Sequence, residues 1–269
     1  IRDRSTFYNS ERLKYNQMNY NNDVELDNFC SQCLLVINAV GPSFKINDKI
    51  ALHALRNNCH YIDIGGYGIL RDLLKPYEKS IEAQKLCFII GVGWMPGISG
   101  VFSKTIIETH LNSPENTNFN IYYGAVDNWS YSSTYDLAAS SMGKTRSYVY
   151  SHGKEIQVSP FRYTHHKFFP FIGHKKICMP SFDEQLTQLA TSLKQIRKIS
   201  TFIMLNDYIS MGKFMFIKIF YKHNLNKATL MLQDDYQRLV KKENKWGSVI
   251  CQVSKIEPER KIDTFYYLY

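Results

Sequence analysis

The sequence predicts an α/β fold in which a parallel sheet is followed by an α+β domain with a mainly antiparallel sheet. Three observations lead to this prediction. Strand-like and helix-like segments alternate over residues 1–111, which is typical of a parallel sheet covered by helices. Three of these strand-like segments end in turns that contain glycine. From residue 119 onward, apolar and polar residues alternate within several segments, as they do in half-exposed strands.

The most informative segment is Cys33–Pro42, which reads Cys-Leu-Leu-Val-Ile-Asn-Ala-Val-Gly-Pro. Its five consecutive apolar residues predict a strand that is buried on both faces, and Gly41-Pro42 ends it. Ligands of open parallel sheets bind beyond the carboxyl ends of the strands. The segment Asn38–Pro42 is therefore the first candidate for a cofactor site.

The other elements of the first half follow from apolar spacing and from helix-breaking residues. Helices are predicted at 24–31, 45–57, 70–84 and 98–111, and Pro76 places a break inside the third of them. Strands are predicted at 60–64, which ends in Gly65-Gly66, and at 86–90, which ends in Gly91–Gly97. The three glycine-bearing turns should then lie side by side at one edge of the sheet.

The second half predicts strands at 120–127, 175–180, 198–205 and 248–256, and a hairpin at 148–158. Helices are expected at 134–142, at 182–194 and from 207 to 242, with a break near Asn224. We therefore divide the chain into a partial nucleotide-binding domain, 1–111, and a substrate-binding or dimerisation domain, 119–269.

Composition excludes several functional classes. The net charge is +9, but the Lys and Arg residues are scattered, so we expect no nucleic-acid partner and a general attraction to anionic ligands. No apolar run approaches the roughly 20 residues of a membrane span, so no membrane partner is expected. Six irregularly spaced cysteines indicate reduced thiols of a cytoplasmic protein, and the pair Cys30 and Cys33 has no second pair at zinc spacing.

Three motifs together resemble the saccharopine dehydrogenase family. They are Asn38-Ala39-Val40-Gly41-Pro42, then Tyr61-Ile62-Asp63 followed by Gly65-Gly66, then Gly91-Val92-Gly93 with Pro96-Gly97. Their order and spacing are similar to those of the family, and the likeness covers about the first 100 residues. The resemblance implies an NAD(P)-binding Rossmann-like domain. The chain has no Gly-x-Gly-x-x-Gly turn, so we expect it to begin inside such a domain and both ends to be trimmed.

The resemblance also implies roles for individual residues. The residues implied to bind the cofactor are Arg2, Arg4, Asn38, Ala39, Val40, Gly41, Pro42, Asp63, Gly65, Gly66 and Gly93. Arg2 and Arg4 follow the position of the second strand, where an arginine pairs with the 2′-phosphate of NADP, so NADP is favoured over NAD. Trp94, Pro96 and Gly97 are implied to shape the substrate pocket. Gly65 and Tyr67 depart from the family pattern, which leaves the substrate open.

Each candidate also has a purely structural interpretation. Asn38 and Gly41-Pro42 fit an ordinary strand-to-helix turn, and Asp63 fits a residue that braces such a turn. Trp129 and Tyr131, candidates for substrate binding, also fit a core cluster with Tyr135. His165, His166 and His174 have no carboxylate at ligand spacing, so no metal is predicted. No residue is selected as catalytic: Lys104 and Lys144 are conceivable proton donors without further support.

The leading functional hypothesis is an NAD(P)-dependent oxidoreductase that resembles saccharopine dehydrogenase. In that family a hydride passes between the nicotinamide and the carbon of an imine formed from an amine and a 2-oxo acid. Three alternatives stay open: an enoyl reductase of the same family, a non-catalytic binding protein that retains the fold, and an anion-binding interaction module. A small-molecule substrate is expected, and alternating strands in the second half suggest a homodimer.

Overall fold

The computed structural model describes residues 14–66, 68–110, 114–142, 147–181, 184–257 and 259–268. Its helices are α1 (Asp23–Cys30), α2 (Ser43–Ile46), α3 (Lys49–Arg56), α4 (Gly68–Leu74), η2 (Lys75–Tyr77), α5 (Glu78–Ala83), α6 (Ile98–Thr109), η3 (Pro114–Asn116), α7 (Tyr131–Met142), α8 (Pro160–Tyr163), α9 (Glu184–Ser192), α10 (Tyr208–Phe220) and α11 (Leu225–Val240). Its strands are β1 (Leu35–Asn38), β2 (His60–Asp63), β3 (Phe88–Ile90), β4 (Thr117–Val126), β5 (Ser147–Ser151), β6 (Lys154–Val158), β7 (His165–Phe169), β8 (His174–Pro180), β9 (Lys198–Leu205), β10 (Trp246–Ile256) and β11 (Lys261–Leu268).

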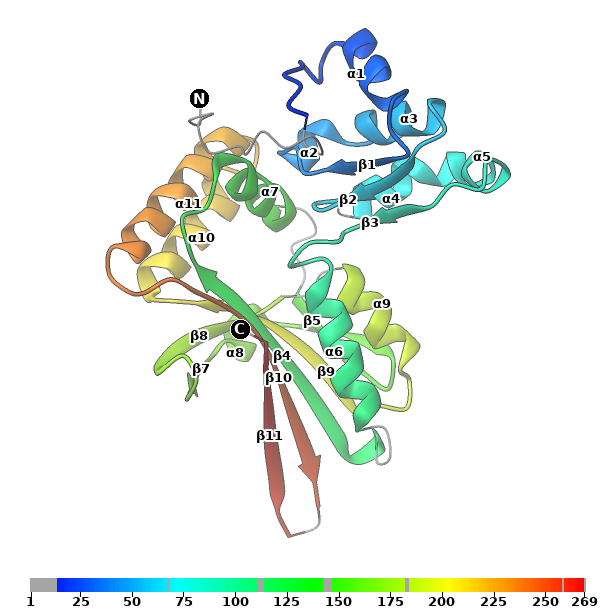
Figure 1. Cartoon of the computed structure of the whole chain (residues 1–269). Helices are drawn as coiled ribbons and strands as arrows, with labels where there is room; N and C mark the ends of the chain where they lie inside the picture. The colour runs from blue at the N-terminus through cyan, green and yellow to red at the C-terminus, as the bar shows by residue number, and fades with distance from the viewer. Residues whose placement is uncertain are drawn as a thin grey trace.

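The first half forms a three-stranded parallel sheet in the order β1-β2-β3 (Figure 1). One face packs on helices α1, α3 and α4, and its core includes Val36, Tyr61 and Leu70. The predicted helix at 70–84 is broken around Pro76, as expected, into α4, η2 and α5. The three strands run in the same direction, so their turns meet at one edge of the sheet. This arrangement confirms the predicted parallel sheet.

The prediction that β1 is buried on both faces is wrong for the described chain. Its side chains alternate between exposed and buried, and the side chain of Ile37 is 61% exposed. Ile37 lies beside Ile62 and Ile89 in register, so one apolar row crosses all three strands on the face opposite α3. The continuous apolar run misled the prediction because parallel strands usually carry helices on both faces. Here the described helices pack on only one of them.

The second half forms an eight-stranded sheet among the described residues, in the order β11-β10-β4-β9-β5-β6, with β8 pairing β9 and β7 pairing β8. Only β4 and β9 pair in parallel, so the sheet is mainly antiparallel, as predicted. Helices α6 and α9 cover one face through a core that includes Ile107, Leu186 and Ile121. The predicted fold class is confirmed.

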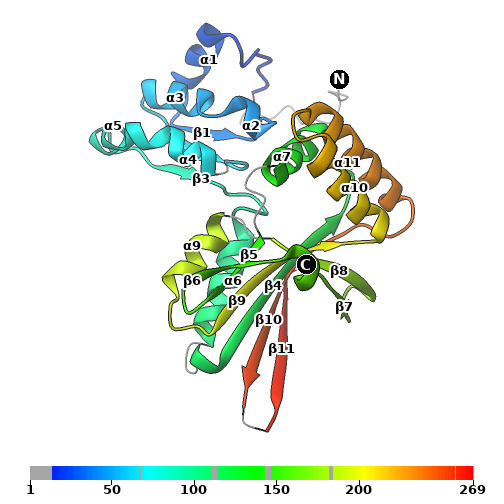
Figure 2. The same ribbon diagram turned by 180° about the vertical axis from the view of Figure 1, so that it is seen from behind.

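Helices α7, α10 and α11 form a separate layer beside the end of the sheet (Figures 1 and 2). Ala138, Phe214 and Leu232 join them in one apolar cluster. The predicted break near Asn224 is confirmed, because the Asn224 side chain accepts a hydrogen bond from the Lys227 amide and caps α11.

The sequence analysis missed strands β7 and β11, and it predicted one helix over 45–57 where the structure has two. Asn47 divides α2 from α3, and its backbone φ is +50°. Asparagine tolerates this left-handed region better than most residues. The short side chain therefore permits a turn that apolar spacing alone does not reveal.

Candidate functional site

The site is built at the edge where β1, β2 and β3 end. The turn 38–42 follows β1, the turn 63–66 follows β2, and the turn 91–97 follows β3. One apolar side chain is exposed just beyond each strand: Val40 is 40%, Ile64 43% and Val92 48% exposed. The edge therefore offers an apolar surface where ligands of parallel sheets bind.

A buried hydrogen-bond network ties the first two turns together. The Tyr61 hydroxyl donates to the Asp63 carboxylate at 2.6 Å, and the Asn38 amide nitrogen donates to the same oxygen at 2.7 Å. The other Asp63 oxygen accepts from the Gly65 amide at 2.9 Å. Burial raises the pKa of Tyr61, so the phenol stays protonated and acts as the donor.

The same network positions Val40, whose amide donates to the Asn38 side-chain oxygen at 3.0 Å. Asn38 and Asp63 are only 5% and 3% exposed. Their side chains are thus occupied with bracing the turns. The bracing interpretation offered for Asp63 describes this geometry, and any role of these two residues in cofactor binding acts through the backbone that they hold.

Helix α7 of the second half contacts the first turn and the start of α2. The Asp136 carboxylate accepts hydrogen bonds from the amides of Ser43 and Phe44, at 2.9 and 3.1 Å, and so caps α2 from the other domain. Burial raises the pKa of Asp136, although these two amides favour the carboxylate. A Cβ on Gly41 would lie 2.9 Å from the Cβ of Ser132, so glycine is required at this close approach.

The third turn is fastened by α9. The Gln185 side chain accepts from the Gly97 amide at 2.9 Å and donates to the Gly97 carbonyl at 3.3 Å. Nearby, Arg71 forms an ion pair with Glu184. Gly97 has a φ of +130°, which only glycine adopts readily. The second domain therefore holds the edge of the sheet at both its first and its third turn.

An open cleft of about 590 Å³ lies next to the third turn. Its walls are Trp94, the segment 125–130 that joins β4 to α7, and Lys245–Gly247 at the start of β10. Trp129 stacks on Tyr236, with ring centroids 4.7 Å apart and planes 7° apart. Cofactor and substrate sites commonly have volumes of about 300–1,000 Å³ and aromatic walls.

A charged pair at the mouth of this cleft was not found from the sequence. The Lys245 ammonium lies 2.8 Å from the Asp127 carboxylate, and this hydrogen bond lowers the pKa of Asp127. Lys245 directly precedes β10 and Asp127 directly follows β4, and these two strands pair in the sheet. The two residues are far apart in the sequence and belong to no short motif, so only the strand pairing brings them together.

A smaller enclosed cavity of about 80 Å³ adjoins the cleft, because Trp94, Ala125 and Trp129 line both. Most of its lining is apolar, but the carboxylate of Asp235 also borders it. That carboxylate pairs with Arg238 at 2.8 Å. The cavity could accept only a small apolar group.

The predicted site residues fall into three groups. The turns 38–42, 63–66 and 91–97 come together at one edge, and Trp94 and Trp129 both line the cleft. Tyr131 instead donates to Asn226 on α11 and does not line the cleft. Arg2 and Arg4 lie outside the described residues, as does Lys144.

The other polar candidates have structural surroundings. Lys104 pairs with Glu108 on the exposed side of α6. His165 lies edge-on to Tyr122 and Phe202 in the sheet. In the described part of the chain, no three His, Cys, Asp or Glu side chains lie together as metal ligands would, and no described helix is long and apolar enough to cross a bilayer.

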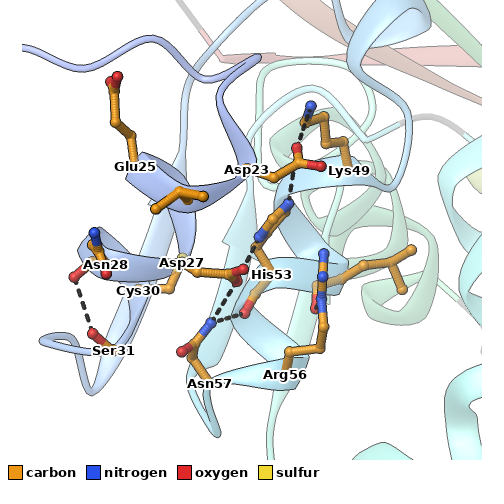
Figure 3. A network of polar contacts seen from close by, with 12 residues as sticks. Asp23, Glu25, Asp27, Asn28, Cys30, Ser31, Lys49, His53, Arg56 and Asn57 are labelled. Carbon is orange, nitrogen blue, oxygen red and sulfur yellow. Dashed lines mark hydrogen bonds and ion pairs between the residues drawn. The ribbon is translucent and has the colours of Figure 1, made fainter.

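A second polar network lies away from the sheet edge and joins α1 to α3 (Figure 3). The ring of His53 is 1% exposed, and its Nδ1 lies 2.6 Å from the Asp27 carboxylate. Asn57 donates to the same carboxylate at 3.0 Å, and the bond to His53 lowers the pKa of Asp27. Asp23 binds Lys49 beside it. These contacts explain how α1 is fixed to the domain.

Comparison with known proteins reveals similarity in structure but not in sequence. No protein-family model matches the chain, and no curated protein does. Apo saccharopine dehydrogenase (L-Glu forming) from Saccharomyces cerevisiae matches with a TM-score of 0.58 and 13% identity, over 93% of this chain and 74% of that one. The chain has the fold of that dehydrogenase.

Two more distant structures also match. GenD2 from gentamicin A biosynthesis, in complex with NAD, matches with a TM-score of 0.36 and 4% identity over 86% of this chain and 54% of that one. A dehydrogenase from Clostridium difficile matches with a TM-score of 0.35 and 6% identity over 89% and 65%. At these scores and identities, the likeness of these two adds nothing to the fold shared with saccharopine dehydrogenase.

Proposed function

We propose that the protein is an NAD(P)-dependent oxidoreductase of the saccharopine dehydrogenase type, acting on an imine or amino-acid-like substrate. The observation that carries the proposal is the meeting of the three turns at one sheet edge, directly beside the cleft that Trp94 and Trp129 line. The shared fold supports it. On this proposal residues 1–111 bind the cofactor and residues 119–269 bind the substrate.

The described residues fit the nicotinamide half of such a cofactor. A flat ring needs an apolar surface at the carboxyl ends of the strands, and Val40, Ile64 and Val92 are exposed there. The cleft that would receive the ring is bordered by Trp94. The Gly-x-Gly-x-x-Gly turn that binds the pyrophosphate half in such domains does not occur in this sequence. We assign the preference for NADP to Arg2 and Arg4.

The nicotinamide, when bound, would supply or accept the hydride, and the chain would orient the two reactants. Trp94 and Trp129 would exclude water from the cleft and hold a planar substrate group between them. Lys245 would carry a proton at its Nζ or pair with a substrate carboxylate, because its ammonium stands at the cleft mouth beside Asp127. Both roles are part of the proposal.

The test is a fluorescence titration of the chain with NADPH and with NADH, using two matched variants. Val40→Glu places a carboxylate in the apolar surface at the sheet edge and should weaken NADPH binding at least about tenfold, because a carboxylate loses its hydration when an uncharged ring packs on it. Val24→Glu is the control, because Val24 is also an exposed valine, at 67%, but it lies on α1. Equal affinities of the two variants, or no binding by the wild type, would contradict the proposal.

A non-catalytic binding protein is the second candidate, and the observation that favours it is that the Asn38 and Asp63 side chains at the sheet edge are used to brace the turns. The two candidates differ in turnover. The oxidoreductase should oxidise NADPH when an amine and a 2-oxo acid are supplied together, and Lys245→Ala should slow this reaction more than Lys104→Ala. Tight NADPH binding without any turnover would favour the non-catalytic protein.

A further inference from the structure

The solvent-exposed face of α10 is apolar, whereas the exposed face of a surface helix is usually polar. Five of its thirteen residues are large, apolar and exposed: Tyr208 at 64%, Ile209 at 51%, Phe216 at 40%, Ile219 at 66% and Phe220 at 66%. At about 100° per residue they fall on one side of the helix, together with Gly212. A surface helix usually shows water its polar side.

The opposite side of α10 is already used for packing. Phe214 and Ile217 are buried against α7 and α11. The exposed rings of Phe216 and Phe220 lie 4.5 Å apart, so they form one patch, and Leu230 on α11 is a further exposed apolar residue, at 57%. Apolar patches of this kind mark interaction surfaces.

Positive charge predominates around the patch. Residues 208–233 contain four lysines, at 213, 218, 222 and 227, and no aspartate or glutamate. Lys213 pairs with Asp234 on α11. In the described part of the chain, none of the other three lysines forms an ion pair. Lys218 is half-buried over the ring of Phe214, so the uncompensated positive charge beside the patch comes from the exposed Lys222 and Lys227.

We propose that α10 docks the protein onto an anionic membrane surface. Ile219 and Phe220 would enter the boundary between headgroups and acyl chains, while the exposed Lys222 and Lys227 would contact lipid phosphates. Such a helix lies in the interface and does not span the bilayer. A second copy fits less well, because a two-fold interface would bring the lysines of both copies together.

The test is co-sedimentation of the full chain with lipid vesicles. The protein should bind vesicles that contain phosphatidylserine and phosphatidylcholine, and more weakly bind vesicles of phosphatidylcholine alone. The double variant Ile219→Glu/Phe220→Glu should lose at least about tenfold in affinity, because both changed side chains leave the apolar boundary. Lys222→Glu/Lys227→Glu should weaken binding and reduce its dependence on salt.

The matched control is Phe161→Glu on α8, where another phenylalanine is 73% exposed. It should bind vesicles as the wild type does, and circular dichroism should show all variants folded. Absence of vesicle binding would overturn the proposal, as would equal binding to neutral and anionic vesicles. A wild-type dimer in gel filtration that Ile219→Glu/Phe220→Glu converts to monomers, without any vesicle binding, would assign α10 to self-association instead.

Discussion

The network around Asp63 makes a quantitative prediction about stability. Replacing Asp63 with alanine removes the acceptor of the buried Tyr61 hydroxyl and of the half-buried Gly65 amide, whereas the Asn38 amide keeps its second acceptor, the Tyr61 oxygen, at 3.0 Å. Each buried donor left without a partner costs about 1–3 kcal/mol. Asp63→Ala should therefore lower the free energy of unfolding by about 4 kcal/mol, a large part of the 5–15 kcal/mol typical of a domain.

A milder variant provides the control. Tyr61→Phe removes one donor but leaves the carboxylate its bonds to Asn38 and Gly65, so the loss should be about 2 kcal/mol. Urea unfolding followed by circular dichroism measures both losses. If Asp63→Ala changed the free energy of unfolding by less than about 0.5 kcal/mol, the network as described would be refuted.

The same pair of variants separates two roles in cofactor binding. Tyr61 is 0% exposed, so it cannot touch a ligand. If Asp63 acts by bracing the turns, Tyr61→Phe should also weaken NADPH binding, by a smaller factor than Asp63→Asn. If Tyr61→Phe left the affinity unchanged while Asp63→Asn lowered it, Asp63 would contact the cofactor directly.

Three further predictions concern other polar contacts. Asp136→Ala should destabilise the chain by about 1 kcal/mol in urea unfolding, because α2 loses its cap. Burial opposes ionisation of Asp207, but bonds from Arg238 and the Ser210 amide outweigh it and lower its pKa to about 2. The lowered pKa contributes about 1 kcal/mol to the free energy of unfolding, after a discount because the side chain is 34% exposed. This contribution is present above about pH 4 and is lost as the pH falls toward 2. In unfolding measured over a pH series, Asp207→Asn should therefore lack this loss of stability. His53→Ala should cost about 1–3 kcal/mol and open α1 to amide exchange, whereas exchange unchanged in α1 would contradict the role in Figure 3.

The sequence predicted those parts of the fold that local patterns determine. Apolar spacing and glycine-bearing turns located the three parallel strands, and Pro76 and Asn224 marked helix breaks. The prediction failed where pairing between distant segments determines whether a strand forms and which of its faces is buried. The sequence of β7 begins His165-His166-Lys167, which does not predict a strand, and the segment forms one because it pairs with β8. The prediction that β1 is buried on both faces failed for the same reason, because no local pattern shows which face of a strand is covered by other elements.

The residues of the candidate site also divide into those that local motifs reveal and those that only long-range contacts bring together. Asn38, Asp63 and Trp94 could be found from motifs because each stands at a strand end. Lys245 and Asp127 could not, because only the pairing of β10 with β4 brings them together. Asp136 was missed because its partners are backbone amides of the other domain, and backbone groups leave no trace in the sequence.

The glycines of the three motifs have a structural explanation that limits what the resemblance implies. A Cβ on Gly41 would meet Ser132, one on Gly65 would meet Ser43, and one on Gly97 would meet the backbone of Gly93. Each glycine thus lets a turn close on another part of the chain, with no ligand required. The motifs therefore identify the fold and the shape of the sheet edge. In the proposed function the cleft residues orient the reactants and carry the proton, so substitutions at Lys245 and Trp129 test that proposal more directly than substitutions of the glycines.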